Sequence, residues 1–321
     1  MLAALAAAAL GLTPAATSAQ DDPSANGDPE GRGPIQIGGG VPFGLYFPLA
    51  GAICQLIEDR GDGARSCRVA ALADSAAAID ALRRAEVDMA LVQSDWLAHA
   101  VAGTSRFQQT GALDELRAVA SLHGEGLVIL MRRGEAAGGP QSLEGMRVSR
   151  GPQQSYRALL TYQLLRAVDL SIDDLAQATD EPVREGLAKL CRGETDAVAA
   201  ITARPAQVAA AAPAGCALDY LPIDERQADG ASQDMPGVAP LALPLDGDGR
   251  RLASFGMTAV LTADASSDPD AIERAARGLI EGAERLARLH PALAVIAPGR
   301  LERAARVAPL HPAADAVYRG R

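Results

Sequence analysis

The residues best suited to bind a charged small molecule lie where a short apolar strand gives way to a helix. A strand is expected at residues 147–149, Gly151-Pro152 ends it, and a helix is expected from about Gln153 to Ala167. The first turn of a helix exposes backbone N–H groups and carries partial positive charge, so it favours a carboxylate or a phosphate. Ser155 adds a hydroxyl there, and Arg157 adds a guanidinium that can form two parallel hydrogen bonds to a carboxylate. The segment predicts an anion site, with a solvent-facing Arg157 as the alternative.

A glycine-rich loop follows the first expected strand. Gly38-Gly39-Gly40 leads into a loop at 41–48 that carries Phe43 and Tyr46. The spacing G-x-G-x-x-x-G is one residue longer than the dinucleotide-binding fingerprint, and no acidic residue ends a second strand about 20 residues further on. Glycine lets the backbone approach a ligand closely. We therefore predict that Gly40, Phe43 and Tyr46 line a ligand cleft, with an ordinary turn between strand and helix as the alternative.

Two further polar residues follow expected strands. Ser94 lies just beyond a buried strand at 87–92, and Arg204 follows a strand that ends at Thr202. Open α/β sheets bind ligands at the carboxyl ends of their strands, so both side chains are predicted to face a ligand. Ser94 is equally suited to cap a helix.

Catalytic motifs are missing from the sequence. The histidines, at positions 99, 123, 290 and 311, show no H-E-x-x-H spacing, and no G-x-S-x-G occurs. We expect no enzyme activity, no metal and no cofactor. The formal net charge of −10 gives no electrostatic support to nucleic-acid binding. An anionic ligand is still possible, because local arginines and helix N-termini set the potential inside a cleft.

The four cysteines allow three disulfide pairings. No C-x-x-C occurs and no histidine lies near a cysteine in sequence, so a zinc site is not expected. If the protein is exported, local pairing of Cys54 with Cys67 and of Cys191 with Cys216 is favoured.

The start of the chain favours export. Residues 1–19 form an uncharged Ala/Leu run that ends in Thr17-Ser18-Ala19, as in a signal peptide, although the usual preceding basic residues are missing. Residues 20–33 are polar and rich in Gly, Pro and Asp, which is typical of a disordered linker. No other segment approaches the length of a membrane span. We therefore expect a soluble periplasmic protein.

Strands and helices alternate along the mature chain, which indicates βαβ units and a parallel sheet. Apolar runs at 116–121 and 127–131 flank His123-Gly124-Glu125-Gly126, where two glycines suit a bend between two lobes. The segment 224–251 is expected to be mostly loop. Residues 270–289 have helical apolar spacing.

The ordered set of motifs resembles the TAXI-type solute receptors of TRAP transporters. The resemblance covers about Pro34 to Tyr318 and rests on the following segments: IGGG at 37–40, GLYFP at 44–48, GAIC at 51–54, DMALVQSDW at 88–96, LRAVASLH at 116–123 and PLHP at 309–312 with Tyr318. It implies a two-lobed periplasmic-binding-protein fold of type II, α/β in class, with the ligand cleft between the lobes. It also implies a membrane permease as partner and a small acidic ligand such as glutamate or a dicarboxylate.

Departures from the family pattern fall in the expected pocket. Leu72-Ala73-Asp74-Ser75 stands where the family shows Thr-Gly-Gly-Ser, so Ser75 alone is kept. Gly151-Pro152-Gln153-Gln154-Ser155-Tyr156-Arg157 stands where the family shows Asn-Pro-Gly-Ser-Gly-x-Arg, and Arg204-Pro205 replaces a His-Pro pair. The resemblance adds Ser75 and Gln154 to the expected ligand contacts.

Taken together, these features predict a first lobe at 34–126, a second at 127–254 and a return to the first at 255–321. The predicted function is capture of a small anionic solute for a TRAP-type permease. A ligand-sensing receptor for a signalling partner is the alternative, and a periplasmic enzyme on the same scaffold is a third possibility.

Overall fold

The computed structural model describes residues 33–42, 44–59, 65–245 and 250–320. The segments predicted to be a signal peptide and a linker lie outside the described residues, apart from Gly33. Phe43, one of the predicted cleft residues, lies outside them as well. No helix in the described ranges is long and apolar enough to cross a membrane.

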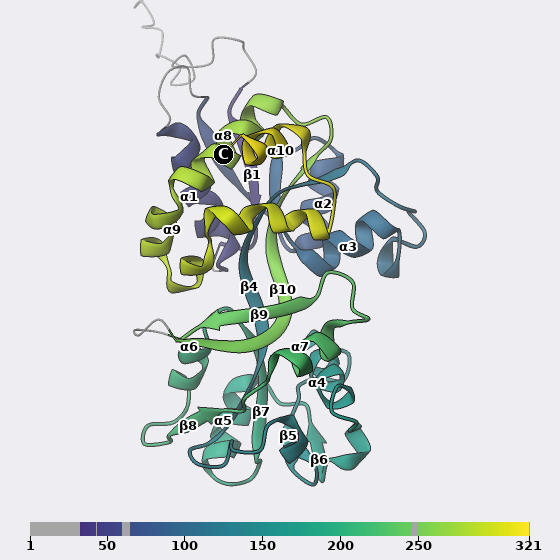
Figure 1. Cartoon of the computed structure of the whole chain (residues 1–321), viewed down its shortest axis with the longest axis vertical. Coiled ribbons are helices and arrows are strands. Elements are labelled where there is room, and N and C mark those ends of the chain that lie inside the picture. The colour runs from purple at the N-terminus through teal and green to yellow at the C-terminus, as the bar shows by residue number, and fades with distance from the viewer. Residues whose placement is uncertain (1–32, 43, 60–64, 246–249, 321) are drawn as a thin grey trace, which may run out of the picture.

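Two groups of helices and strands are joined by two long strands (Figure 1). The joining strands are β4 (Leu116–Arg132) and β10 (Arg251–Asp264). The upper group, here called the upper lobe, consists of β1 (Ile35–Gly39), α1 (Tyr46–Glu58), β2 (Cys67–Ala71), α2 (Ser75–Arg83), β3 (Met89–Gln93), α3 (Ser94–Ala102), η2 (Ser105–Phe107), α8 (Pro269–Glu281), α9 (Ala283–Leu289), η5 (Pro291–Val295), η6 (Pro298–Arg306) and α10 (Pro312–Arg319).

The lower group, here called the lower lobe, is formed by the middle of the chain (Figure 1). It consists of η3 (Pro140–Leu143), β5 (Arg147–Ser149), α4 (Tyr156–Arg166), η4 (Ile172–Asp174), β6 (Gln177–Thr179), α5 (Val183–Cys191), β7 (Ala197–Thr202), α6 (Pro205–Ala210), β8 (Leu218–Tyr220), α7 (Glu225–Ser232) and β9 (Ala239–Pro244).

The two lobes share one strand order. In the upper lobe it is β2-β1-β3-β10-β4, and in the lower lobe it is β6-β5-β7-β4-β8. In each order the second strand, β1 or β5, pairs in parallel with both of its neighbours, and the third strand, β3 or β7, also pairs with an antiparallel strand. The antiparallel partner is a joining strand in both lobes, so the chain crosses between the lobes through the sheets themselves.

The joining strand β4 differs from the sequence-based expectation. Two strands with a bend at His123–Gly126 were expected, whereas β4 is one strand of 17 residues. Its pairing with β10 shifts register between Thr258 and Val260 and between Leu261 and Thr262. Such irregularities bend and twist a strand without ending it. The predicted boundaries at 126/127 and 254/255 fall within these two joining strands and stay predictions.

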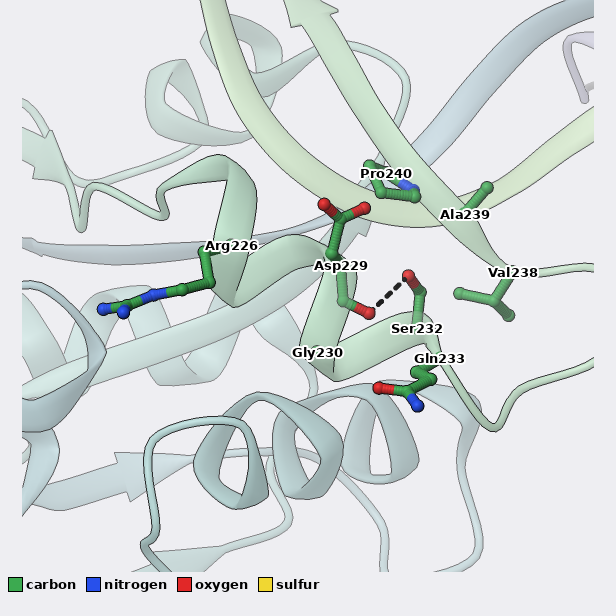
Figure 2. Close-up of a pocket in the computed structure, with 8 residues that line it drawn as sticks. All are labelled: Arg226, Asp229, Gly230, Ser232, Gln233, Val238, Ala239 and Pro240. Carbon is green, nitrogen blue, oxygen red and sulfur yellow. Dashed lines mark hydrogen bonds between the residues drawn. The ribbon is translucent and has the colours of Figure 1, made fainter.

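The prediction that 224–251 is mostly loop was wrong for part of the segment. Helix α7 begins with a capping box, in which the Asp224 carboxylate accepts from the Gln227 amide and the Gln227 side chain accepts from the Asp224 amide. Strand β9 forms because it pairs with β10. Together α7 and β9 line a hollow of about 600 Å³ (Figure 2).

The expected helix at 270–289 is divided into α8 and α9 at Gly282. A Cβ at Gly282 would lie 2.3 Å from the Leu56 side chain of α1, so the chain needs glycine to pass this close. Glycine is also a poor helix former, which makes it a natural point of interruption.

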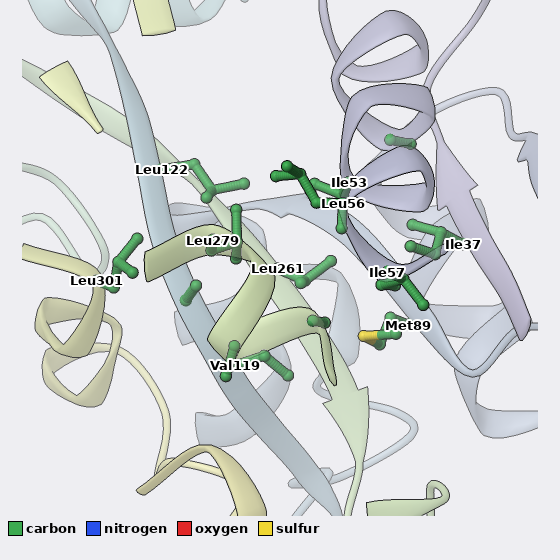
Figure 3. Packing of buried hydrophobic residues seen from close by; sticks show 14 of the residues in the cluster. Ile37, Ile53, Leu56, Ile57, Met89, Val119, Leu122, Leu261, Leu279 and Leu301 are labelled. Atoms are coloured by element: carbon green, nitrogen blue, oxygen red, sulfur yellow. The ribbon is translucent and has the colours of Figure 1, made fainter. Parts of the chain in front are cut away.

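Helices cover both faces of each sheet, and each lobe has its own apolar core. Met89 and Leu91 of β3 pack under α1 and α8, while Ala90 and Val92 point to the opposite face, as strand alternation requires. Figure 3 shows the first of these layers, with Ile53 and Ile57 of α1 over the sheet. The lower lobe buries a separate set around α4 and α7, including Phe255 with no exposed area.

Both predicted disulfides are present, one in each lobe. Cys54 of α1 is bonded to Cys67 of β2, and Cys191 of α5 is bonded to Cys216 before β8. Their Cα separations of 5.1 and 5.7 Å lie in the usual range for a bridge.

Candidate ligand cleft

The carboxyl ends of the parallel strands carry most of the predicted site residues. Strands β1, β2 and β3 end near Gly40, Ser75 and Ser94, while β5 and β7 end near Ser155 and Arg204. A crevice beyond the carboxyl ends of parallel strands is the usual ligand site of an open α/β sheet.

A cavity of about 460 Å³ is lined by residues of both lobes. Across it, Arg204 Nη1 lies 3.5 Å from His290 Nε2. Arg204 begins α6 in the lower lobe and His290 follows α9 in the upper lobe, so this contact links the two lobes. The lining consists of Gly44, Leu45, Pro48, Glu125, Ile201, Thr202, Ala203, Arg204, Gln207 and His290.

A polar cluster stands on the upper side of this cavity. Gln93 Nε2 donates to Glu125 Oε2 at 3.2 Å, and His123 Nε2 lies 3.5 Å from Glu125 Oε1. The His123 ring is fully buried and meets the Tyr46 ring edge to face, with centroids 5.6 Å apart. Burial alone would raise the pKa of the Glu125 carboxyl, but the contacts with His123 and Gln93 outweigh it and lower that pKa. Glu125 is therefore an ionised acceptor at neutral pH.

Tyr46 adds a buried hydroxyl to this cluster. Its Oη has no hydrogen-bond partner among the described residues. Burial, and then the nearby Glu125 and Asp95 carboxylates, raise the pKa of Tyr46 well above its ordinary value, so the hydroxyl keeps its proton. Gly40 leaves room for Tyr46, because a Cβ at position 40 would lie only 3.3 Å from Tyr46 Cβ.

A second buried acid, Asp95, lies in the first turn of α3, and its Oδ1 has no hydrogen-bond partner among the described residues. Burial raises the pKa of the Asp95 carboxyl, although the nearby Trp96 and Asp95 amides and the hydroxyl of Tyr156, the first residue of α4, offset part of this. Burial and the Asp95 charge also raise the pKa of Tyr156.

Arg157 is engaged within the lower lobe. Its Nη1 donates to the Ala199 carbonyl at 3.2 Å, and its Nη2 donates to the Glu181 carbonyl at 2.5 Å. The guanidinium lies against Gly151, where φ is +85° and a Cβ would be 2.1 Å from Arg157 Nε. Burial lowers the pKa of Arg157 from its usual high value. The structure thus gives Arg157 two backbone partners between β7 and the loop after β6.

The predicted serines make local contacts. Ser75 Oγ accepts from the Gln93 amide at 3.1 Å. Ser94 Oγ accepts from the Thr258 amide at 2.9 Å and donates to the Gly237 carbonyl at 2.5 Å. Ser155 is the N-cap of α4, and its Oγ accepts from the Ala158 amide at 3.2 Å. Gln154 is exposed on the loop before it.

Of the predicted site residues that the structure describes, Arg204 is the one that lines the cavity. Tyr46 packs on His123 beside the lining residue Glu125, and Ser75 and Ser94 do not line the cavity. The sequence had shown Asp95 beside Ser94, and His123 and Glu125 beside the expected bend, without indicating that they approach Tyr46. Nothing in the sequence around Tyr156 or His290 indicated that either residue would lie near the site.

A second hollow lies between α7 and β9 in the lower lobe (Figure 2). Ser232 Oγ points into it and donates to the Asp229 carbonyl at 3.2 Å, while the Arg226 side chain points away from the other lining residues. It is lined by the lower lobe alone, unlike the cavity around Arg204.

Comparison with known proteins supports the fold. The sequence model of the NMT1-like family matches residues 37–320. A sulfonate-binding protein of a putative sulfonate ABC transporter from Methylobacillus flagellatus KT has a similar structure, with a TM-score of 0.50, 11% identity, and coverage of 89% of this chain and 84% of that one. For the aliphatic sulphonate-binding protein of Escherichia coli, the TM-score is 0.46 and the identity 16%, with coverage of 89% of this chain and 78% of that one. For a Prochlorococcus marinus protein solved with methylphosphonate, the TM-score is 0.43 and the identity 10%, with coverage of 82% of this chain and 88% of that one. The similarity to the Methylobacillus flagellatus protein shows the fold alone, a two-lobed binding-protein fold, as predicted from the sequence.

Proposed function

This chain belongs to the NMT1-like family, and we propose that it is an exported, periplasmic solute-binding receptor that captures a small anionic metabolite between its lobes. The observation that carries the proposal is the cavity of about 460 Å³ lined by both lobes. Ligand sites in proteins are typically concave, of about 300–1,000 Å³, with a few convergent polar groups. Closure of two lobes around such a cavity is a common means of holding a solute.

The charge of the lining supports a solute with an acidic group. Arg204 provides a guanidinium, and Gly44 and Leu45 place the start of the 13-residue helix α1 at the cavity. A helix N-terminus and an arginine both favour a carboxylate. Because Arg204 lines the cavity and Arg157 does not, we assign the ligand's acidic group to Arg204 in preference to Arg157.

Glu125 on the same cavity favours a ligand that also donates hydrogen bonds. A carboxylate acceptor repels a second carboxylate but binds an ammonium or hydroxyl group. Of the two ligand kinds implied by the resemblance, a glutamate-like solute therefore fits better than a dicarboxylate.

For the partner, we propose a membrane permease of the TRAP type, on the resemblance described above. The sulfonate-binding protein of similar fold is attributed to an ABC transporter, which makes an ABC-type permease the competing assignment. Co-purification of the tagged receptor with each candidate permease in detergent distinguishes the two.

Native mass spectrometry of freshly purified protein identifies a retained solute, and calorimetry then tests the site. Arg204→Ala is expected to weaken binding by on the order of 10²-fold, because losing one partner of a buried charge pair costs about 2–5 kcal/mol. Arg226→Ala is the matched control, since Arg226 borders the other hollow and points away from it. Unchanged affinity in Arg204→Ala together with weakened affinity in Arg226→Ala would place the ligand between α7 and β9 and refute the proposed site.

A further inference from the structure

Two side chains meet across the cleft with the same hydrogen-bonding role. Arg204 Nη1 of the lower lobe lies 3.5 Å from His290 Nε2 of the upper lobe, and both residues line the cavity of about 460 Å³. An arginine guanidinium has N–H donors and no acceptor. The contact is therefore a hydrogen bond only if His290 Nε2 is an acceptor, and the protonation state of the ring decides this.

The other ring nitrogen of His290 fixes that protonation state. His290 is the N-cap of η5, and its Nδ1 accepts from the Ala292 amide at 3.2 Å. A neutral imidazole has one donor and one acceptor nitrogen, so a ring that accepts through Nδ1 carries its proton on Nε2. A doubly protonated ring could not accept from the amide at all. His290 Nε2 and Arg204 Nη1 are thus two donors that face each other.

Two facing donors gain nothing from each other and favour an acceptor that both can share. A negatively charged oxygen group accepts charge-assisted hydrogen bonds of about 2.7–2.9 Å, so it can bind at once to two nitrogens that lie 3.5 Å apart. Arg204 is the N-cap of α6 in the lower lobe and His290 follows α9 in the upper lobe, so each lobe supplies one donor. An oxyanion held in this way contacts both lobes.

We propose that Arg204 and His290 together bind one oxyanion of the solute, a carboxylate or a sulfonate, with His290 Nε2 as the donor from the upper lobe. The proposal rests on the proposed function and adds a second ligand-binding residue for the same acidic group. A ligand shifts a conformational equilibrium only through contacts that differ between the two states. An oxyanion bound from both lobes makes such contacts, because they exist only when the lobes stand as close as they do here.

A second histidine provides a matched control. His311, like His290, is followed by Pro-Ala and is an N-cap, and its Nδ1 accepts from the amide two residues further on, that of Ala313, at 3.3 Å. His290 lines the cavity and His311 does not. Asparagine at either position keeps an acceptor for the capping hydrogen bond but removes the Nε2 donor. Weaker anion binding in His290→Asn and not in His311→Asn is therefore not caused by a lost cap.

NMR of the protein labelled with ¹⁵N-histidine tests the pair at about pH 8, where an ordinary imidazole is neutral. His290 is expected to be the Nε2–H tautomer. Titration with sodium acetate, the carboxylate probe, or sodium methanesulfonate, the sulfonate probe, is expected to shift the His290 Nε2 resonance saturably. The probe that binds more tightly identifies the acidic group. Arg204→Ala is expected to abolish the shift.

The backbone amide of Arg204 reports probe binding when the histidine is replaced. Its resonance is expected to give a dissociation constant at least about tenfold higher in His290→Asn, because a hydrogen bond to a charged group is lost, and an unchanged one in His311→Asn. An Nδ1–H tautomer, no saturable shift with either probe, or equal affinities in the two variants would overturn the proposal.

These probes do not depend on the identity of the natural solute. The role of His290 can therefore fail while a solute retained in native mass spectrometry still binds through Arg204. Conversely, the pair can bind acetate or methanesulfonate while no retained solute is found, which would count against the proposed function and not against the pair.

Discussion

The two lobes have closely related strand orders but carry opposite charge where they face each other. The upper edge holds the carboxylates of Asp95 and Glu125, both largely shielded from water. The lower edge holds Arg204, which lines the same cavity as Glu125, whereas Arg150 and Arg157 donate to carbonyls within the lower lobe. Complementary charge across an interface favours association in one orientation. The comparison shows that a repeated topology fixes where the strand ends lie and leaves their side chains to determine how the lobes meet and what they bind.

Use of the charged groups also differs between the lobes. In the lower lobe Arg157 is bound to two carbonyls, and Arg150 Nη1 donates to the Gly151 carbonyl at 2.9 Å. In the upper lobe the Tyr46 hydroxyl has no partner among the described residues. The lower-lobe arginines are therefore held by their own backbone, whereas the upper lobe leaves a buried hydroxyl without a partner among the described residues.

Removing the disulfide of one lobe or the other is expected to give the largest change in free energy of unfolding among these tests. The bridges close loops with sequence separations of 13 and 25 residues. In the chain-entropy account they stabilise by about 3 and about 3.5 kcal/mol respectively. We expect the double variant Cys191→Ser, Cys216→Ser to lose slightly more free energy of unfolding than Cys54→Ser, Cys67→Ser in urea titrations. A larger loss from the upper-lobe pair would show that native packing of α1, and not loop length, decides the difference.

The variant Arg157→Ala tests whether Arg157 stabilises the fold while Arg204 binds the solute. We expect a loss of about 2–3 kcal/mol in free energy of unfolding, because two buried carbonyls lose a charged donor. Arg157→Lys is expected to recover only part of it, since an ammonium cannot replace the planar guanidinium. Arg204→Ala is the comparison variant and is expected to lose less than about 1 kcal/mol. If Arg157→Ala unfolds like the wild type yet binds solute at least tenfold more weakly, Arg157 and not Arg204 holds the acidic group.

The smallest expected effect is a difference in acid sensitivity. Burial, and then Arg117, lower the pKa of His311 in the upper lobe, so its stabilisation is complete above the unfolded pKa of about 6.5 and declines as pH falls below it. In the lower lobe, burial would raise the pKa of Glu181, but the hydrogen bond and charge of Lys189 and the nearby Thr179 hydroxyl bring it down to about 2. That stabilisation is complete above about pH 4.3 and is lost only as pH falls towards 2.

Lowering the pH from 7.5 to 5.5 should therefore weaken the upper lobe first, by about 1 kcal/mol or less. His311→Asn keeps a side-chain acceptor for the Ala313 amide, which His311 Nδ1 now accepts at 3.3 Å, and is expected to flatten the pH dependence seen in urea unfolding. Glu181→Gln should leave the dependence in this range unchanged. An equal slope in wild type and His311→Asn would assign the effect to other groups.

Much of the fold could be predicted because it follows from local patterns. Strand–helix alternation indicated the parallel sheets, and the spacing of the cysteines indicated both bridges. The expectations for β4, for 224–251 and for 270–289 failed where partners distant in sequence decide the outcome. Strand β4 is continuous because β10 pairs along it, and β9 forms because it pairs with β10. Helix α8 ends where Gly282 packs closely against the Leu56 side chain.

The sequence by itself determined which residue types stand at the strand ends, including Arg204, Tyr46, Ser75 and Ser94. Only the tertiary structure decided which of them meet. His123 and Glu125 lie in the middle of a strand, and Tyr156 begins a helix in the other lobe, so no spacing rule links them to Tyr46 or Asp95. Their contacts arise because β4 and β10 cross between the lobes and set one sheet edge against the other. A local pattern fixes backbone conformation, whereas a binding site depends on the distances between segments that the chain brings together only on folding.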